Sequence, residues 1–433
     1  MSGEPLKVGL LGAGTVGSQV ARILLEESAE LEQRVGTRLE LIGVGVRDLD
    51  KPRPGISPEL LTTDLEGVVD RSDVLIEVMG GLEPAGSLVR RALDNGASVV
   101  TANKALLAEE LASLSELADA REVDLYYEAA VAGAIPIVRP LRESLVGDEV
   151  TSVMGIVNGT TNFILDKMVT SGLSFDDALR QAQELGYAEA DPTADVEGHD
   201  AAAKAALLAG LAFHTKVKGS EVHCEGISGI TTQDIESAKA MNCTVKLLAV
   251  AHDGGESVVV KVHPAMVPLT HPLAAVSGAY NAVFVTTREA GELMFLGPGA
   301  GGSPTASAVM GDVVTVARHR VRGGSSQSPS TYRNRPVAPI GASRTRYFVS
   351  LEVEDRPGIL SRCASVFASH NVSVQTVQQS YLEGLGRQDG FAARLGFMTH
   401  EAAEADLAGV VEDLRRADFV GENVRFMRIE GAR

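Results

Sequence analysis

Residues 6–28 read LKVGLLGAGTVGSQVARILLEES. An apolar, strand-like run ends at three glycines in G-x-G-x-x-G spacing, Gly12, Gly14 and Gly17, and a segment with helical apolar spacing follows. In dinucleotide-binding turns the first glycine permits a tight turn, the second lets the backbone approach a pyrophosphate, and the third allows close packing of helix on strand. The order of strand, glycine turn and helix therefore predicts a Rossmann-type, nucleotide-binding domain.

Alternating strand-like and helix-like segments continue to about residue 150, which is typical of a parallel, doubly wound α/β sheet. The strand-like segments are 39–46, 73–80, 97–102 and 123–129, and the helix-like ones are 84–96 and 106–120. We predict that residues 1–150 form this domain and that a helix within 303–320 returns to complete it. The alternative is an α/β domain whose glycine turn binds no nucleotide.

Charged residues follow two of the predicted strands, where the ligands of such folds bind. Arg47 precedes Asp48 at the end of the second strand. An acid there binds the ribose 2′-hydroxyl of NAD, whereas an arginine accepts the 2′-phosphate of NADP. The arginine slightly favours NADP, but NAD stays open. The alternative is that these charges belong to a solvated loop that contacts no cofactor. Lys104 follows the strand that ends near Thr101, which makes it a candidate contact for a carboxylate or phosphate, or a merely exposed lysine.

The most concentrated chemistry lies in residues 185–204, LGYAEADPTADVEGHDAAAK. Five acids precede the single lysine Lys204, namely Glu189, Asp191, Asp195, Glu197 and Asp200. Asp200 and Lys204 are four residues apart, so a helix places them on one face, and its apolar remainder directs that face toward an interior or cleft. A lysine held between burial and a carboxylate can move protons. The alternative is a surface ion pair worth only ~0.3–0.5 kcal/mol.

Residues 151–302 change to an α+β pattern and are expected to supply the substrate side. A glycine-rich turn at 299–302 could bring backbone amides against a phosphate or the nicotinamide end of a cofactor. Ser174 and Asp177 have capping-box spacing, which is a purely structural feature.

Composition restricts the class of protein. The chain has 433 residues, 45% of them hydrophobic, and a net charge of −18. This charge argues against nucleic acid and anionic membranes as partners, and favours small-molecule chemistry. The three cysteines are far apart, and one is left over in any disulfide scheme, which indicates a reducing compartment. We see neither a zinc-ligand pattern nor a signal peptide, and we expect a soluble, cytoplasmic protein.

The last part of the chain predicts a linker and a third domain. Residues 321–345 are rich in Ser, Gly, Pro and Arg, and are expected to be a flexible linker whose basic residues are solvated. Residues 346–433 follow the order strand, helix, strand, strand, helix, strand, which is ferredoxin-like. The turn from Asp355 to Gly358 opens amides toward a possible anionic ligand, and no catalytic set is visible in this domain.

With these motifs in order, the sequence resembles homoserine dehydrogenases across nearly the whole chain. The resemblance rests on GAGTVG (12–17), TANK (101–104), YEAAVAGAIPI (127–137), GIVNGTTNFIL (155–165), the acidic segment that ends at Lys204, and GPGAGG (297–302). The tail from about Tyr347 resembles an ACT domain, a small amino-acid-binding regulatory module.

The resemblance implies reversible, NAD(P)-dependent interconversion of L-homoserine and L-aspartate 4-semialdehyde, a step toward threonine, methionine and isoleucine. Lys204 matches the family's proton donor, and Glu189 and Asp200 match substrate-binding positions, with Asp195 as a supporting charge. Lys104 lies between cofactor and substrate. Feedback inhibition by L-threonine through the ACT domain and a homodimer or homotetramer are expected on the same ground.

Three further sets of residues come from the resemblance. Cofactor contacts are implied at Gly12, Gly14, Thr15, Val16, Gly17, Arg47, Lys104, Gly186 and Gly302. A monovalent cation, usually sodium, is implied at Glu128, Val131, Gly133 and Ile135, through one carboxylate and main-chain carbonyls. Effector contacts are implied at Asp355, Gly358 and Asn371.

Two rival interpretations remain open from the sequence. Another dehydrogenase of amino-acid metabolism could join a Rossmann domain to an ACT domain, but a serine-pathway enzyme is expected to use an Arg/His/Glu set. A non-enzymatic sensor of NAD(P) or amino acids would keep both domains and would have no need for Lys204.

Overall fold

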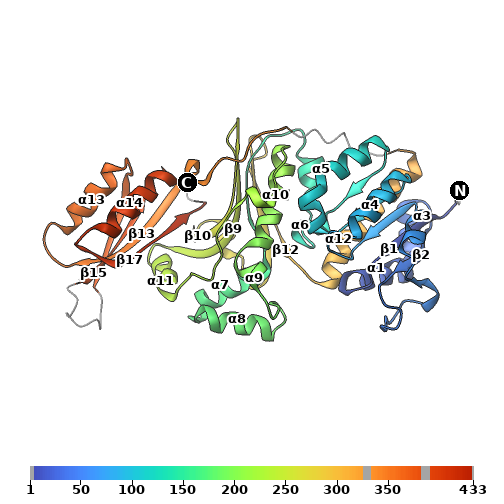
Figure 1. Cartoon of the computed structure of the whole chain (residues 1–433), viewed down its shortest axis with the longest axis horizontal. Coiled ribbons are helices and arrows are strands. Elements are labelled where there is room, and N and C mark those ends of the chain that lie inside the picture. Colours follow the sequence, from blue (N-terminus) through green and yellow to red (C-terminus); the bar gives the residue numbers. More distant parts are fainter. Residues whose placement is uncertain (1–3, 325–332, 382–390, 432–433) are drawn as a thin grey trace.

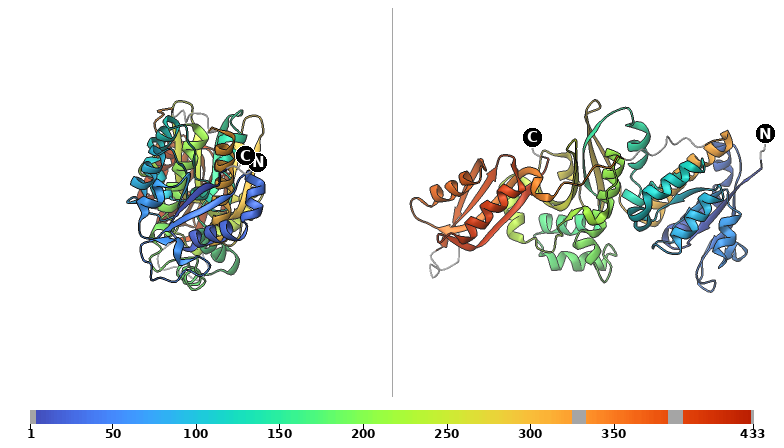
Figure 2. Two further views of the ribbon diagram at one scale, coloured as in Figure 1. Left: turned by 90° about the vertical axis from the view of Figure 1, so that its right-hand side faces the viewer. Right: turned by 45° about the horizontal axis from the view of Figure 1, so that its top comes forward.

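The computed structural model describes residues 4–324, 333–381 and 391–431. Three regions follow one another along the long axis of the molecule, with the N-terminal domain at one end and the C-terminal domain at the other (Figures 1 and 2). Within the described ranges, every helix is too short or too polar to span a bilayer.

The N-terminal domain is the predicted parallel, doubly wound sheet. Its strands lie in the order β3-β2-β1-β4-β5-β6, and all neighbouring pairs are parallel. The strands are β1 (Leu6–Leu11), β2 (Leu39–Gly45), β3 (Leu61–Thr62), β4 (Val74–Glu77), β5 (Ser98–Thr101) and β6 (Leu125–Tyr126). The helices are α1 (Thr15–Glu26), α2 (Ser28–Val35), α3 (Leu65–Asp70), α4 (Ala85–Asp94) and α5 (Lys104–Ala120). The strand order reverses between β1 and β4, so a ligand crevice is expected at their carboxyl ends.

A distant helix belongs to this domain's core. Helix α12 (Gly302–Arg322) buries Val309, Val313 and Val316 in the same apolar cluster as Val8 and Val20 of β1 and α1. The chain therefore leaves the N-terminal domain, builds the middle one, and returns.

The middle domain packs helices on a mixed sheet. Its strands are β7 (Val150–Ile156), β8 (His223–Cys224), β9 (Cys243–Asp253), β10 (Val258–Pro268), β11 (Tyr280–Thr287) and β12 (Glu292–Pro298). Its helices are α7 (Gly159–Ser171), α8 (Phe175–Glu184), α9 (Thr193–Val196), α10 (His199–Phe213) and α11 (Thr232–Ala240), and the short α6 (Ala129–Ala132) and a π-helical turn (Pro140–Ser144) precede it. Ser174 caps α8 by accepting from the Asp177 amide, as its spacing predicts.

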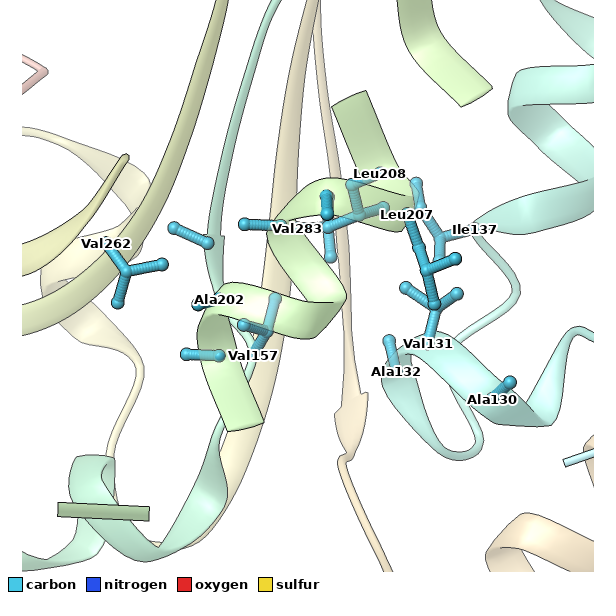
Figure 3. Packing of buried hydrophobic residues seen from close by; sticks show 14 of the residues in the cluster. Ala130, Val131, Ala132, Ile137, Val157, Ala202, Leu207, Leu208, Val262 and Val283 are labelled. Atoms are coloured by element: carbon cyan, nitrogen blue, oxygen red, sulfur yellow. The ribbon is translucent and has the colours of Figure 1, made fainter. Parts of the chain in front are cut away.

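Helix α10 is buried along nearly all of its length. Apart from His199, Asp200 and Lys204 near its start, its side chains are apolar and nearly all buried around the whole helix, which is typical of a helix enclosed by protein. Figure 3 shows Leu208 beside Val283 of the sheet, and Leu207 facing Val131 and Ile137 near α6. This packing fixes the axis of the helix that carries Asp200 and Lys204.

The C-terminal domain has the predicted ferredoxin-like order. Its elements are β13 (Arg344–Glu354), α13 (Ile359–Ser369), β14 (Val374–Tyr381), β15 (Phe391–Thr399), the two-residue β16 (Ala402–Ala403), α14 (Glu404–Arg416) and β17 (Val420–Ile429). The sequence did not predict that its sheet continues into the middle domain. Strand β17 pairs in parallel with β10, through Ala265 with Arg428 and Met266 with Ile429.

Buried charges lie at this junction between the two domains. Lys261 Nζ is 2.8 Å, and His263 Nε2 is 3.3 Å, from Glu430 Oε1, and all three side chains are almost fully buried. Arg428 makes a two-pronged contact with Glu225 of the middle domain, at 2.8 Å on each prong, and also binds Glu404 of the C-terminal domain. The junction is therefore built from ion pairs as well as from strand pairing.

The prediction of a flexible linker at 321–345 is wrong for the residues that follow 332. Residues 325–332 lie outside the described residues, but Arg333 and Val337 form bridges with the middle domain. Arg335 is not solvated, because its guanidinium donates to Asp253 at 2.7 Å and to the Phe213 carbonyl at 2.6 Å. These contacts attach the chain to the middle domain before β13 begins.

Candidate functional site

The glycine turn after β1 has the geometry that a dinucleotide requires. Gly12 has φ +100°, and a Cβ there would lie 2.8 Å from the Val78 carbonyl oxygen. A Cβ on Gly17 would lie 2.0 Å from the Gly12 carbonyl oxygen, so only glycine fits. Gly14 precedes α1 and has open space around its Cβ position, where a pyrophosphate could approach the amides of Thr15 and Val16.

A second turn at the same sheet edge positions Lys104 at the start of α5. Asn103 caps this helix by accepting from the Leu106 amide, and its Nδ2 donates to the Gly81 carbonyl at 2.7 Å. The fully buried Glu77 accepts from the Thr101 hydroxyl at 2.6 Å. Sequence reasoning missed Glu77, although an acid that ends an apolar strand beside a glycine pair was a usable signal.

Asp200 is the acceptor at the centre of the site. One carboxylate oxygen accepts from Lys104, and the other accepts from Lys204 at 2.7 Å. The Lys204 ammonium also donates to the Val157 carbonyl at 2.8 Å. The predicted pairing of Asp200 with Lys204 is therefore present, and it is an enclosed pair, because their side chains are only 6% and 12% exposed. The surface alternative does not apply.

Burial and the lysines act in opposite directions on Asp200. Burial by itself raises the pKa of this carboxyl, but the ammonium groups of Lys204 and Lys104 override it and hold the pKa well below its ordinary value. Asp200 is therefore a carboxylate at neutral pH and can accept from both lysines at once.

Asn158 is a site residue that the sequence analysis did not single out beyond its place in the motif at 155–165. Its Nδ2 lies 2.7 Å from Asp195 Oδ1 and 2.9 Å from Asp200 Oδ2. Its Oδ1 accepts from the Thr161 amide at 2.9 Å and so caps α7. An Asn at an N-cap uses only its oxygen for the cap, so the free amide nitrogen was the available signal.

Two neighbouring cavities meet at the lysines. One has a volume of about 590 Å³ and is lined by Asn158, Tyr187, Asp195 and Asp200, among others. The second, of about 330 Å³, extends toward the carboxyl edge of the N-terminal sheet and is lined by Gly80, Asn103 and Thr305, among others. Both are lined by Lys104, Lys204, Gly299 and Ala300. A substrate in the first cavity and a nicotinamide in the second would meet at Lys204.

The remaining residues of the acidic segment lie outside this centre. Glu189 is exposed and does not line either cavity, so its contact with the substrate stays a prediction. Asp191 is also exposed and accepts from the amide and hydroxyl of Thr193, which makes it a turn residue. Gly186, on the same segment, lines the larger cavity with φ +76°.

Two further expected cofactor contacts are Arg47 and Gly302. Arg47 is exposed beyond the end of β2, and the Asp48 carboxylate accepts from the Asp50 amide. Gly302 begins α12 against the start of α1, where a Cβ would lie 2.9 Å from the Thr15 carbonyl oxygen. The glycine-rich turn is thus packed on the nucleotide-binding turn.

The segment expected to hold a cation uses its acid differently than predicted. Both carboxylate oxygens of Glu128 accept backbone amides, from Ile137 at 2.6 Å, Val138 at 2.7 Å and Arg139 at 2.9 Å. The carboxylate therefore holds the next turn, and a cation at Glu128, Val131, Gly133 and Ile135 would depend on main-chain carbonyls, which are hard oxygen ligands suited to such an ion.

The three expected effector residues do not form one site within a single chain. Gly358, with φ +94°, precedes α13, and Asp355 lies just before it. Asn371, with φ +57°, follows the other end of this helix. Because a helix rises 1.5 Å per residue, the two ends are separated by roughly 18 Å, which one small amino acid does not span.

Comparisons with known proteins agree with this architecture. The family model for homoserine dehydrogenase matches residues 136–314, the one for the homoserine dehydrogenase NAD-binding domain matches 12–128, and the ACT domain model matches 347–419. Homoserine dehydrogenases from Corynebacterium glutamicum and Mycobacterium tuberculosis are each 50% identical over 99% of this chain, and 96% and 98% of their own lengths are covered. A crystal structure of a homoserine dehydrogenase from Thiobacillus denitrificans has a TM-score of 0.91 at 36% identity, with 99% of both chains covered. The chain belongs to the homoserine dehydrogenase family.

Proposed function

We propose that this chain interconverts L-homoserine and L-aspartate 4-semialdehyde with NAD(P), as a step toward threonine, methionine and isoleucine, and that Lys204 moves the proton. The observation that carries the proposal is the position of the Lys204 ammonium, which lies where the two cavities meet and is held by Asp200 and the Val157 carbonyl.

NAD(P)H, when bound, supplies the hydride that reduces the aldehyde carbon. Negative charge then develops on the aldehyde oxygen, and the Lys204 ammonium protonates it to give the alcohol. In the oxidising direction, the neutral amine of Lys204 takes that proton back. General acid and base help of this kind contributes ~10²–10⁴-fold to a rate.

The acids of the larger cavity suit an amino acid. Asp195 and Asp200 offer carboxylate oxygens to the substrate ammonium, while Lys104 and the start of α7 offer positive charge to its carboxylate. Glu189 is proposed as a further substrate contact on family resemblance alone, because it is exposed and lines neither cavity.

The test is an NAD(P)H-consumption assay with aspartate semialdehyde, run in parallel with glyoxylate and pyruvate. The proposal predicts turnover with the semialdehyde at least ~100-fold above that with the other carbonyl compounds. Equal turnover of all three would contradict the substrate, and no turnover of any would contradict the enzymatic function.

The coenzyme is proposed to be NADP, with NAD as the alternative. The exposed guanidinium of Arg47, just beyond β2, supports this preference, because the neighbouring Asp48 carboxylate is used by the loop itself. The Arg47→Ala variant is expected to raise KM for NADPH about 10-fold and leave KM for NADH unchanged. Equal changes in the KM for NADPH and the KM for NADH would contradict a contact between Arg47 and the 2′-phosphate.

A monovalent cation, sodium by family resemblance, is proposed to bind the carbonyls of Glu128, Val131, Gly133 and Ile135. It would stabilise the segment that joins the N-terminal domain to the middle domain. Thermal unfolding in sodium chloride and in tetramethylammonium chloride at equal ionic strength tests this. Equal unfolding temperatures in the two salts would contradict it.

Feedback inhibition by L-threonine is proposed to act through the C-terminal domain. The support is a continuous path of contacts from that domain toward α10. Arg428 of β17 binds Glu225 of the middle domain, and the Glu225 amide donates to the Val262 carbonyl at 2.8 Å. Glu225 is thereby held on both sides.

From Glu225 the path reaches the start of the catalytic helix. The Ile227 amide donates to the Val196 carbonyl at 2.7 Å, and the Cys224 thiol donates to the Glu197 carbonyl at 3.2 Å. The next residue, Gly198, is the N-cap of α10, two residues before Asp200. A displacement of β17 would therefore reach the site through this short segment.

The regulation is tested on full-length protein, because removing β17 would expose the edge of β10. Wild-type protein, Glu225→Gln and the exposed control Glu401→Gln are titrated with L-threonine. We expect inhibition of the wild type and the control, and at least a 5-fold higher half-inhibitory concentration for Glu225→Gln with unchanged basal turnover. No inhibition of the wild type would contradict threonine as effector, and an equal response of Glu225→Gln would contradict the path.

A further inference from the structure

Asn158 is placed between the two elements that carry the acids of the site. It follows β7 and precedes α7, and its side chain is buried. The Thr161 amide and hydroxyl lie 2.9 and 3.1 Å from its Oδ1. The amide donor fixes which end of the Asn158 side chain is oxygen, since a nitrogen there would face an N–H group. The Nδ2 group must therefore point toward the acids.

The two N–H bonds of Nδ2 have one carboxylate each. Asp195 belongs to α9, and Asp200 belongs to α10. Two carboxylates that approach one position repel each other, and one of them takes up a proton unless donors lie between them. With Asn158 as this donor, two carboxylates and two lysines balance at a formal charge of zero around the cavity.

The preceding residue, Val157, holds the other member of the catalytic pair. Its carbonyl accepts from Lys204, while the Asn158 side chain donates to the Asp200 oxygen that also accepts from Lys204. Two consecutive residues therefore fix both ends of the pair, one through the main chain and one through the side chain.

We propose that Asn158 is a positioning residue for this reaction, acting through Asp200 and Asp195. It turns Asp200 so that one oxygen faces each lysine, and it holds the Asp195 carboxylate at the wall of the cavity that would take the substrate ammonium. This inference rests on the proposed proton transfer by Lys204.

Two substitutions separate this role from helix capping. Asn158→Ser keeps an N-cap residue but is too short to reach the acids. Asn158→Asp also keeps the cap, but it adds a carboxylate beside Asp195 and Asp200. The matched control is Ser174→Ala, which removes the cap of α8 and none of the site contacts.

For Asn158→Ser we expect at least about a 10-fold rise in KM for homoserine, because a hydrogen bond to a charged group is lost. For Asn158→Asp the added anion favours the charged form of the neighbouring lysine, so the rising limb of the pH profile for homoserine oxidation is expected to move to higher pH. Ser174→Ala is expected to unfold at lower temperature. Its KM for homoserine and the position of the rising limb of its pH profile are expected to be unchanged.

Each measurement is made on the folded fraction, quantified by circular dichroism, so that loss of fold does not imitate loss of function. An unchanged KM in Asn158→Ser together with an unchanged limb in Asn158→Asp would overturn the positioning role. If Lys204→Ala retained full turnover, the proposed proton transfer by Lys204 would be contradicted. If Lys204→Ala were inactive while the Asn158 variants behaved as wild type, only the positioning role of Asn158 would be contradicted.

Discussion

The replacement Glu430→Gln probes the buried charges that join the C-terminal domain to the middle domain. Glu430 Oε1 lies 2.8 Å from Lys261 Nζ and 3.3 Å from His263 Nε2, and none of the three side chains is more than 6% exposed. Burial alone raises the pKa of this carboxyl, but contact with His263 and Lys261 overrides it and lowers the pKa from 4.5 to about 2. Glutamine keeps the shape and removes the charge.

The magnitude follows from this shift in pKa. A lowering of this size corresponds to about 3 kcal/mol at pH 7, and breaking a buried ion pair typically costs ~3–5 kcal/mol. Because the pKa of Glu430 is lower in the folded state, its stabilisation is present above pH 4.5 and is lost as the pH falls toward 2. At pH 3 only about 1 kcal/mol of this contribution remains by the same relation.

The assay is urea unfolding followed by far-UV circular dichroism, since the chain has no tryptophan. Wild-type protein, Glu430→Gln and the exposed control Glu401→Gln are compared at pH 7 and pH 3. We expect the gap between wild type and Glu430→Gln to shrink by more than half at pH 3, while the control stays close to wild type. A gap below about 1 kcal/mol at pH 7, or one that does not shrink with acid, would refute the reasoning.

Three other replacements have definite expected outcomes. Gly17→Ala places a Cβ 2.0 Å from the Gly12 carbonyl oxygen, so the turn must shift, and NADPH affinity by titration should fall at least about 10-fold; wild-type affinity would contradict this. Arg335→Ala removes the donor to the Asp253 carboxylate and the Phe213 carbonyl, and should lower the free energy of unfolding in urea by ~2 kcal/mol. An unchanged urea midpoint would mean that Arg335 does not hold the residues after 332 on the middle domain. Asp200→Asn removes the charge that both lysines share, and should lower kcat/KM for homoserine by about 100-fold with near-normal NADPH binding; a fall under 5-fold would contradict its central role.

Local signals in the sequence predicted much of the fold. The glycine spacing at Gly12 and Gly17 encodes a turn that no other residue permits, and the alternation of apolar segments encodes the parallel sheet. The Asp200 to Lys204 spacing likewise predicts a pair on one helical face, which the structure contains. These predictions succeed because each depends on residues close together in the chain.

Contacts between distant segments were not predictable in the same way. The pairing of β17 with β10 depends on tertiary packing, and so does the burial of Arg335 within an apparently loop-like segment. The bridging amide of Asn158 was not predicted, because its partners Asp195 and Asp200 lie 37 and 42 residues further along the chain. The three backbone amides that the Glu128 carboxylate accepts come from a turn that the sequence does not mark.

The central claim is that Lys204 transfers the proton at the meeting point of the two cavities. The most direct measurement is the rate of NADPH consumption with aspartate semialdehyde by wild type and Lys204→Ala, alongside the NADPH dissociation constant of each. The account predicts a fall in kcat of at least ~100-fold, with NADPH affinity within about 2-fold of wild type. A kcat within about 10-fold of wild type would contradict it.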